Sequence, residues 1–325
     1  MPLETGPRAR LYDADGHDTE VELTEGVTGR LGKRRLLWVD ADREAGHDLA
    51  TIGHLLDLEP GLVERLQASA GHADLTKYED HLHLILESME PAADGEAAVT
   101  RSIDVVGGRD WVLTVHDGRF PALERLDAVT EGETKLGALD AAGFVAAIAD
   151  EVLTGYLRLV EDTEQEIDRL DERALRGRHG DDVLGDIVAL RRRIGAIRRV
   201  LAPQRVAFAA LARPEMALDE DFGQPWPGLT DRLDRTVDAV EGLRDLLVGT
   251  FDIHMGRAAK DANDVMKVLT LVSAVFLPAV VLAGVMGMNF PLPFFDVPDH
   301  FWIVVGAMLG LSLGILGVAT RRHWL

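Results

Sequence analysis

The sequence has 325 residues, of which 47% are hydrophobic, and a formal net charge of −21 at pH 7. This acidic charge argues against nucleic acid as a partner, because binding phosphates needs a basic surface. With no cysteine in the chain, a disulfide framework and a thiolate metal site are both excluded. The length favours two or more structural units. The first ten residues, MPLETGPRAR, have no apolar stretch, so no signal peptide is expected.

The first part of the chain has short apolar runs rich in branched and aromatic residues, which predict strands over 34–40, 81–89, 101–107 and 110–118. Helices are expected over 42–58, with Asp40 or Asp42 as the N-cap, and from Glu59-Pro60 onward. This mixture predicts a cytosolic α/β domain over 1–140. His81 and His83 alternate in one predicted strand and point to one face; a metal site is one reading, and an exposed strand face is favoured over it.

From residue 143 onward, the apolar residues follow a helical periodicity. Long helices are predicted over 143–177 and 181–212, within a segment of paired cytosolic helices at 141–228. The charge-dense stretch EDTEQEIDRLDE (161–172) favours a solvated helix face. Apolar residues recur at three- and four-residue spacing from Leu229, which predicts a stalk helix over 229–267. No proline follows until Pro278, so this helix is expected to continue into the next segment.

Two runs near the C-terminal end have no charged residue, Val268–Phe290 and Phe301–Thr320. Each is long enough to span a membrane as a helix. The sequence therefore predicts transmembrane helices over 268–290 and 301–320, joined by an external loop at 291–300 and followed by a basic tail at 321–325. Two spans cannot enclose a pore, so a channel built from this chain would have to be an oligomer.

The flanking charges predict the orientation in the membrane. The loop between the spans has no Lys or Arg and contains Asp296 and Asp299. Basic residues lie on the other side of both spans: Arg257, Lys260, Lys267, Arg321 and Arg322. The positive-inside rule then predicts a multi-pass protein of the cytoplasmic membrane with both termini in the cytosol.

The stretch NDVMKVLTLVSAVFLPAVVLAGVMGMNF (263–290), a short loop, a second span and the ending RRHWL together resemble the CorA family of divalent-cation channels. Weaker similarity extends over TKYEDHLHLIL, VLTVHDG, VEDTEQEIDRLDE and RRVLAPQR. The resemblance implies an α+β membrane protein that forms a funnel-shaped homopentamer in contact with membrane lipid. The first span would line the pore, the transported divalent cation would take the place of a cofactor, and the chain would not be an enzyme.

The same resemblance assigns roles to residues. Gly287, Met288 and Asn289 would form an entrance filter, in which the Asn289 amide oxygen accepts hydrogen bonds from the waters of a hydrated ion; a glycine helix end with an incidental Asn is the structural alternative. Asn263 would form an inner polar ring, and Met266 and Leu277 apolar constrictions. The complete expected pore stripe, for which ordinary helix packing is the alternative, is Asn263, Met266, Thr270, Ser273, Leu277, Val280 and Gly284.

Three features depart from the family pattern. Met286 replaces an aromatic residue before the Gly-Met-Asn triplet, and the external loop lacks its usual Glu, leaving Asp296 and Asp299 to supply negative charge. An acidic residue that holds a regulatory metal in relatives falls on Gly228, for which Asp231 and Asp234 could substitute. The resemblance also suggests a basic collar of Lys267, Arg321 and Arg322, for which simple membrane anchoring is an equal alternative.

Three functions remain open from the sequence. Influx of Mg²⁺, and also of Co²⁺ or Ni²⁺, is favoured. A proton-coupled Zn²⁺ transporter of the ZntB-like branch is the first alternative, and a non-conducting, membrane-anchored metal-sensing scaffold is the second. An enzyme is disfavoured, since the sequence contains no P-loop, zinc-protease motif or nucleophile elbow.

Overall fold

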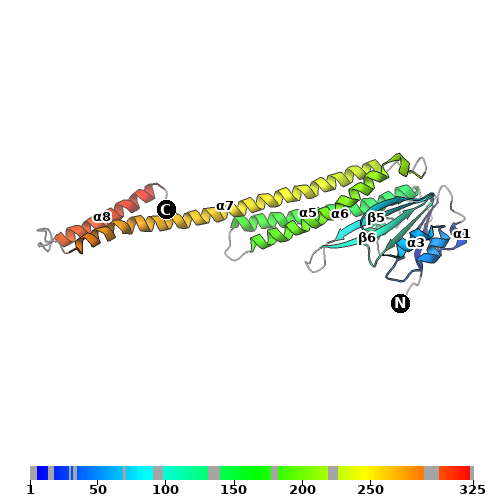
Figure 1. Cartoon of the computed structure of the whole chain (residues 1–325), viewed down its shortest axis with the longest axis horizontal. Coiled ribbons are helices and arrows are strands. Elements are labelled where there is room, and N and C mark those ends of the chain that lie inside the picture. The colour runs from blue at the N-terminus through cyan, green and yellow to red at the C-terminus, as the bar shows by residue number, and fades with distance from the viewer. Residues whose placement is uncertain are drawn as a thin grey trace. The chain divides into compact units, whose positions relative to one another are not determined.

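The computed structural model of the chain describes residues 6–13, 18–28, 31, 35–68, 71–90, 98–130, 140–176, 182–218, 226–288 and 300–322. The chain divides into two compact units. The first comprises Met1–Glu172 and Asp182–Thr250, and the second comprises Arg173–Asp181 and Phe251–Leu325. Figure 1 shows the order of the elements along the chain.

A seven-stranded sheet forms the centre of the first unit, in the order β2-β1-β3-β7-β6-β5-β4. Only β3 and β7 run parallel to each other, with Val39 opposite Leu113, and the other neighbouring pairs are antiparallel. The strands are β1 (Arg8–Asp13), β2 (Thr19–Glu20), β3 (Arg35–Asp42), β4 (Asp74–Lys77), β5 (Leu82–Glu90), β6 (Val99–Gly107) and β7 (Trp111–His116).

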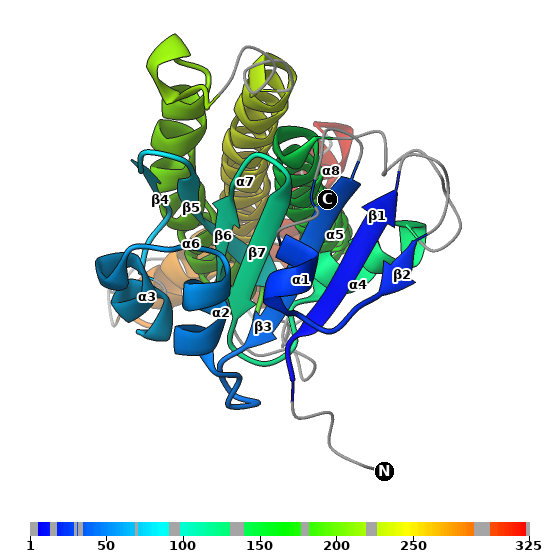
Figure 2. The ribbon, with the colours of Figure 1, turned by 90° about the vertical axis from the view of Figure 1, so that its right-hand side faces the viewer.

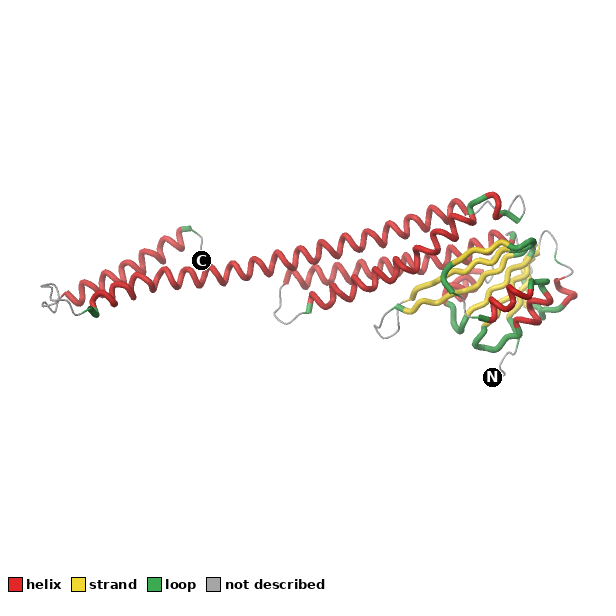
Figure 3. Tube along the Cα trace, viewed as in Figure 1, coloured by secondary structure: helices red, strands yellow, loops and turns green. Residues whose placement is uncertain are grey.

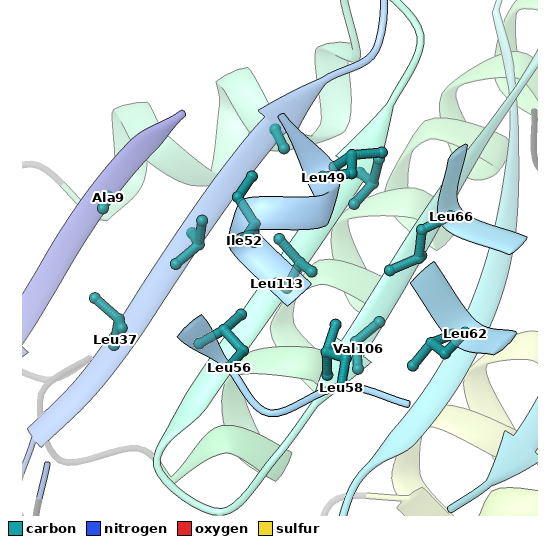
Figure 4. Close-up of a cluster of buried hydrophobic side chains, with 13 residues drawn as sticks. Ala9, Leu37, Leu49, Ile52, Leu56, Leu58, Leu62, Leu66, Val106 and Leu113 are labelled. Atoms are coloured by element: carbon teal, nitrogen blue, oxygen red, sulfur yellow. The ribbon is translucent and has the colours of Figure 1, made fainter. Parts of the chain in front are cut away.

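Short helices cover one face of this sheet (Figure 2). They are α1 (Glu25–Thr28), α2 (Leu49–Leu55) and α3 (Pro60–Gln67). Their apolar side chains form a buried core with the strands, in which Ile52 and Leu62 lie over Leu113 and Val106 (Figure 4). Burying such side chains is the main favourable contribution to folding. The helices α2 and α3 therefore hold this face of the sheet in place.

Long helices cover the opposite face of the sheet. These are α5 (Ala141–Arg176) and α6 (Val183–Leu211), preceded by α4 (Pro121–Thr130). Phe144 of α5 packs its ring against Trp38, with centroids 5.4 Å apart. The Tyr156 hydroxyl and the Gln204 amide both donate to the Glu87 carbonyl oxygen, at 2.9 and 3.0 Å. The helices α5 and α6 are thus both hydrogen-bonded to the same carbonyl group of β5.

The helix α7 (Trp226–Met286) is the longest element, at 61 residues, and follows the 3₁₀ turn η2 (Pro214–Met216). Within the first unit, α7 buries one apolar side that includes Leu233, Val240 and Leu247. It also forms ion pairs with α6: Arg205 to Asp234 at 2.8 Å and Arg198 to Glu241 at 3.7 Å. From the first pair to the second, the residue number falls by seven on α6 and rises by seven on α7, as expected for neighbouring helices that run antiparallel.

The second unit contains the rest of α7 and α8 (His300–Arg321), which lie side by side (Figures 1 and 3). Both helices include an uncharged stretch that is long and apolar enough to cross a membrane. Neither stretch is buried by the chain itself. Water is a poor solvent for such a surface, which supports a membrane as its surroundings.

The predicted architecture of an α/β sheet domain, long helices and two C-terminal apolar helices is confirmed. Two local predictions are wrong. The N-cap of α2 is Asp48, whose side chain accepts from Ala50 N at 3.0 Å, whereas Asp42 accepts from the backbone N–H of Gly118. The strand face that presents His81 and His83 is buried rather than exposed, because α3 covers it.

Candidate functional site

One side of the apolar part of α7 packs against α8. Val275 of α7 and Ser312 of α8 mark the contact, since the Ser312 hydroxyl donates to the Val275 carbonyl oxygen at 3.3 Å. The half-buried residues of the span lie on this side: Leu271, Val275, Pro278, Ala279, Leu282 and Met286 on α7, and Val304, Val305, Met308, Ser312 and Ile315 on α8. Their three- and four-residue spacing defines one face of each helix.

The expected pore stripe lies on the other side of α7. Every member is exposed: Asn263, Met266, Thr270, Ser273, Leu277, Val280 and Gly284. At 3.6 residues per helical turn, the positions of the stripe point about half a turn away from those that contact α8. The chain therefore leaves uncovered the one face of α7 that the sequence assigns to ion passage.

Two hydroxyl groups interrupt the apolar character of this stripe. Thr270 donates to the Met266 carbonyl oxygen at 2.8 Å, and Ser273 donates to the Leu269 carbonyl oxygen at 2.9 Å. Each hydroxyl proton is used within the helix, so the oxygen lone pairs remain as acceptors. An acceptor suits a cation or the hydrogen atoms of its water shell.

The end of α7 approaches the expected filter. Gly287 N donates to Ala283 O at 2.9 Å and Met288 N to Val285 O at 3.2 Å, which ends the helix. Gly287 does not adopt the left-handed backbone of a glycine helix end; among the described glycines only Gly46 and Gly118 have positive φ. Asn289, Asp296 and Asp299 lie outside the described residues.

The expected basic collar is partly neutralised. Lys267 Nζ lies 3.0 Å from a carboxylate oxygen of Asp264, three residues earlier on α7. Arg321 and Arg322 are exposed at the end of α8. The Ser312–Val275 contact and the antiparallel course of the two helices bring Arg321 to the same end as Lys267. Basic side chains at one end of both helices fit the expected cytosolic boundary.

The expected regulatory carboxylates do not act as a pair. Asp234 is engaged by Arg205 at 2.8 Å, while Asp231 is exposed. Within the described parts of the chain, no group of three or more His, Asp or Glu side chains is arranged to hold a metal ion. A regulatory ion at Asp231 would therefore need ligands from elsewhere, such as a second copy of the chain.

His81 and His83 belong to a buried polar network. His83 Nε2 lies 2.7 Å from Asp104 Oδ1, and Asp104 also pairs with Arg43. His81 stacks on Tyr78 and lies 3.0 Å from Glu59. Burial lowers the pKa of His81, against the opposing influence of Glu59 and Asp80. These contacts are those of a structural network within the sheet domain.

Comparison with known proteins shows which family shares this arrangement. Residues 33–319 match the model of the CorA-like Mg²⁺ transporter proteins. The cobalt/magnesium transport protein CorA of Methanocaldococcus jannaschii is 22% identical over 90% of this chain and 92% of that protein. The divalent cation transporter CmaX of Pseudomonas aeruginosa is 30% identical over 55% of this chain and 48% of that protein.

Solved structures share the fold over nearly the whole chain. The complete structure of the M. jannaschii CorA magnesium transporter has a TM-score of 0.76 at 20% identity and covers 98% of this chain and 99% of its own. The full-length CmaX structure has a TM-score of 0.72 at 22% identity, covering 98% and 97%. The cytoplasmic domain of ZntB from Vibrio parahaemolyticus has a TM-score of 0.59 at 15% identity, covering 78% and 99%. With the family model matching most of its length, the chain belongs to the CorA-like Mg²⁺ transporter family, whose members are divalent-cation transporters and not enzymes.

Proposed function

We propose that this chain carries Mg²⁺ into the cell as a homopentamer, with α7 of each copy lining a central pore. The observation that supports this most strongly is the uncovered face of α7. This face bears polar groups at Asn263, Thr270 and Ser273 and lies opposite the contact with α8. A single chain with two spans cannot enclose a pore, so the uncovered faces of several copies must line it together.

The chemistry of the ion explains the expected filter. Mg²⁺ gives up its water shell reluctantly and holds the waters in octahedral geometry. A ring of Asn289 amide oxygens would accept hydrogen bonds from these waters without the strong attraction of a carboxylate. Gly287 fits the same scheme: its backbone is not left-handed, and an added Cβ would come no closer than 3.4 Å to Ala283 O. The single chain does not require glycine here, whereas a narrow pore mouth shared by several copies would.

We infer the sides of the membrane on which the external loop and the two termini lie from the charges that flank the spans. The proposed orientation puts residues 291–300 outside the cell and the sheet domain in the cytosol. Because the chain has no cysteine, one introduced thiol can be labelled without background. Asp296→Cys should react with a membrane-impermeant thiol reagent on intact cells, and Glu124→Cys should react only after the cells are opened. The reverse pattern would contradict the orientation.

Ion flux into proteoliposomes tests the proposed function. Purified protein should admit Mg²⁺ without a pH gradient, and Asn289→Ala should abolish this entry. Leu277→Ala should raise it, because an apolar constriction that gates by dewetting becomes wider. Leu309→Ala is the matched control, since Leu309 is an exposed side chain of α8 outside the α7 contact.

Two other outcomes have specific meanings. Entry of Zn²⁺ alone, driven by a proton gradient, would assign the chain to a ZntB-like function and replace Mg²⁺ as its substrate. The absence of the family's usual loop Glu, together with the ZntB-like fold of the cytosolic part, makes this the alternative to measure alongside Mg²⁺. No flux of Mg²⁺, Co²⁺, Ni²⁺ or Zn²⁺ from an intact oligomer would leave a non-conducting scaffold.

A further inference from the structure

Pro278 weakens the backbone of α7 in the middle of its apolar part. Proline has no N–H, so the Ala274 carbonyl oxygen, four residues earlier, loses its usual donor, and the proline ring crowds that carbonyl. Backbone groups in a membrane must find partners within the protein, because lipid offers none. The turn from Ala274 to Pro278 is therefore the part of this helix that most needs support from a neighbour.

Ser312 donates a hydrogen bond within this turn, to the Val275 carbonyl oxygen beside the Ala274 carbonyl that has lost its donor. Its hydroxyl reaches from α8 to the carbonyl oxygen of Val275, which follows Ala274 directly, at 3.3 Å. Ser312 is half-buried on the face of α8 that packs against α7. A hydrogen bond between two membrane helices at this position joins α8 to the weakened turn.

The other hydroxyl groups of the two apolar helices behave differently. Thr270 and Ser273 bond to carbonyl oxygens of α7 itself, and Thr320 bonds to Gly317 O of α8. Bonding within the same helix is the ordinary choice of Ser and Thr in a membrane helix. Among the described residues of 268–288 and 300–322, Ser312 is the hydroxyl that donates to the neighbouring helix.

The weakened turn also carries part of the proposed ion pathway. Leu277 directly precedes Pro278, and Ser273 directly precedes Ala274. Leu277 and Ser273 both lie on the uncovered face of α7. We propose that Ser312 is a positioning residue for ion passage: its hydrogen bond fixes the turn at Pro278 and thereby holds Leu277 in the constriction. This role rests on the proposed function, whereas the hydrogen bond can be tested without it.

Hydrogen–deuterium exchange of the full-length protein in lipid nanodiscs tests the bond directly. Ser312→Ala should raise amide exchange over residues 276–282 about threefold, in line with a typical hydrogen bond between membrane helices. Ser312→Thr keeps the hydroxyl and should exchange like the unaltered protein. Thr320→Ala, which removes a hydroxyl bonded within α8, is the matched control and should leave residues 276–282 unchanged. Unchanged exchange in Ser312→Ala, or equal increases in the Ala and Thr variants, would overturn the proposal.

Mg²⁺ flux in proteoliposomes tests the positioning role. Ser312→Ala should raise Mg²⁺ entry about threefold by releasing Leu277, and Ser312→Thr should restore the original rate. In a Leu277→Ala background, Ser312→Ala should have no further effect, because the side chain that it positions is absent. Altered exchange with unaltered flux would overturn the positioning role. If the unaltered protein carries no divalent cation, the proposed function and the positioning role both fail, while the exchange result still decides whether the bond supports the turn.

Discussion

At the scale of single residues, the sheet domain contains a buried charge network that the sequence does not reveal. Arg43 follows β3, and its guanidinium contacts Asp104 of β6 and Asp117 after β7. Its Nε also donates to the Leu66 carbonyl oxygen at the end of α3, at 2.6 Å. Asp104 is fully buried and shared with His83. One arginine therefore joins two strands and a helix around a buried carboxylate.

Replacing Arg43 should destabilise the protein strongly. Arg43→Ala leaves the Asp104 carboxylate buried without its guanidinium partner, and breaking a buried pair in this way typically costs about 3–5 kcal/mol. The apparent Tm of the full-length protein, followed by tryptophan fluorescence, should fall accordingly. Arg65→Ala is the control, because Arg65 and Asp74 form a solvent-exposed pair at 3.6 Å; an exposed pair contributes about 0–1 kcal/mol. Equal losses in the two variants would contradict this account.

His116 links stability to pH. Its Nδ1 lies 2.6 Å from Gly118 O and its Nε2 3.2 Å from Asp40 Oδ1, so both nitrogens face acceptors. Burial lowers the pKa of His116, but Asp40, Gly118 and Asp42 outweigh burial and raise it above its usual value. The stabilisation that protonated His116 gives the folded protein is therefore complete below a pH of about 6.5, the ordinary pKa of His. It is lost as the pH rises through the raised pKa of His116.

Thermal melts at several pH values check the direction in which His116 makes stability depend on pH. His116→Gln should lower the apparent Tm more at pH 6 than at pH 9. His81 provides the contrast, because burial lowers its pKa and its protonation favours the unfolded chain. The deficit of His81→Gln should therefore shrink as the pH falls from 7 to 5, whereas that of His116→Gln should shrink as the pH rises. Parallel behaviour of the two variants would refute the assigned directions.

At the scale of elements, the sequence predicts the long helices and the strands β3, β5, β6 and β7 well, whereas it misses the buried strand β1. The helices α5 and α6 fall within two residues of their predicted bounds, since each buries a continuous apolar side over many turns. The edge strand β4 is not predicted, because three of its four residues, DLTK, are polar. Its Lys77 is held by the carbonyl oxygens of Glu215 and Ala217, at 2.7 and 2.9 Å. Lys77 is far from Glu215 and Ala217 in the sequence, so no local sequence pattern predicts these contacts.

The candidate site likewise has features that the sequence predicts and features that depend on tertiary packing. The spacing of the stripe from Asn263 to Gly284 follows from helical geometry once the Gly-Met-Asn triplet sets the register. The face of α7 that α8 covers, and the bond from Ser312 to Val275, depend on the packing of two helices. Ser312 looks like one small residue among many in α8, so the sequence offers no signal that separates it from the glycines around it.

The close contact of α2 and α3 depends on a missing side chain. A Cβ at Gly53 would lie 2.4 Å from Val63 Cγ2. Gly53→Ala should therefore destabilise the sheet domain by about 1–3 kcal/mol, as overpacking of a core usually does. Val63→Ala in the same chain should recover part of the lost Tm. Gly61→Ala, with no atom within 4 Å of its added Cβ, is the control and should not lower the Tm.

At the scale of the whole molecule, the proposed homopentamer requires contacts between copies of the chain. Asp231 and Asp238 are exposed and lie seven residues apart on one side of α7. Asp234 is neutralised by Arg205, which leaves Asp231 as the stronger of the two expected regulatory carboxylates. A regulatory metal ion would then be held jointly by neighbouring copies of the chain.

Removal of the metal tests this hypothesis. A ligand at a hundredfold excess over its Kd adds about 2.7 kcal/mol of stability. Mg²⁺ should therefore raise the apparent Tm of the full-length oligomer, and EDTA should reverse the rise. Asp231→Asn should remove most of the response, and Asp238→Asn, an exposed carboxylate on the same side, should retain it. An undiminished response in Asp231→Asn would place any regulatory ion elsewhere.

The parallel pairing of β3 with β7 has a consequence for how the sheet domain folds. The chain leaves β3 at Asp42 and returns beside it only at Trp111, after α2, α3 and β4–β6. The antiparallel pairs β5–β6 and β6–β7 join strands that follow each other directly and can form early. The seam between β3 and β7 must instead wait for a long loop to close, which makes such contacts slow to form. The middle of the sheet is thus expected to be the last part to assemble, and until then β3 and β7 each present an open edge to other chains.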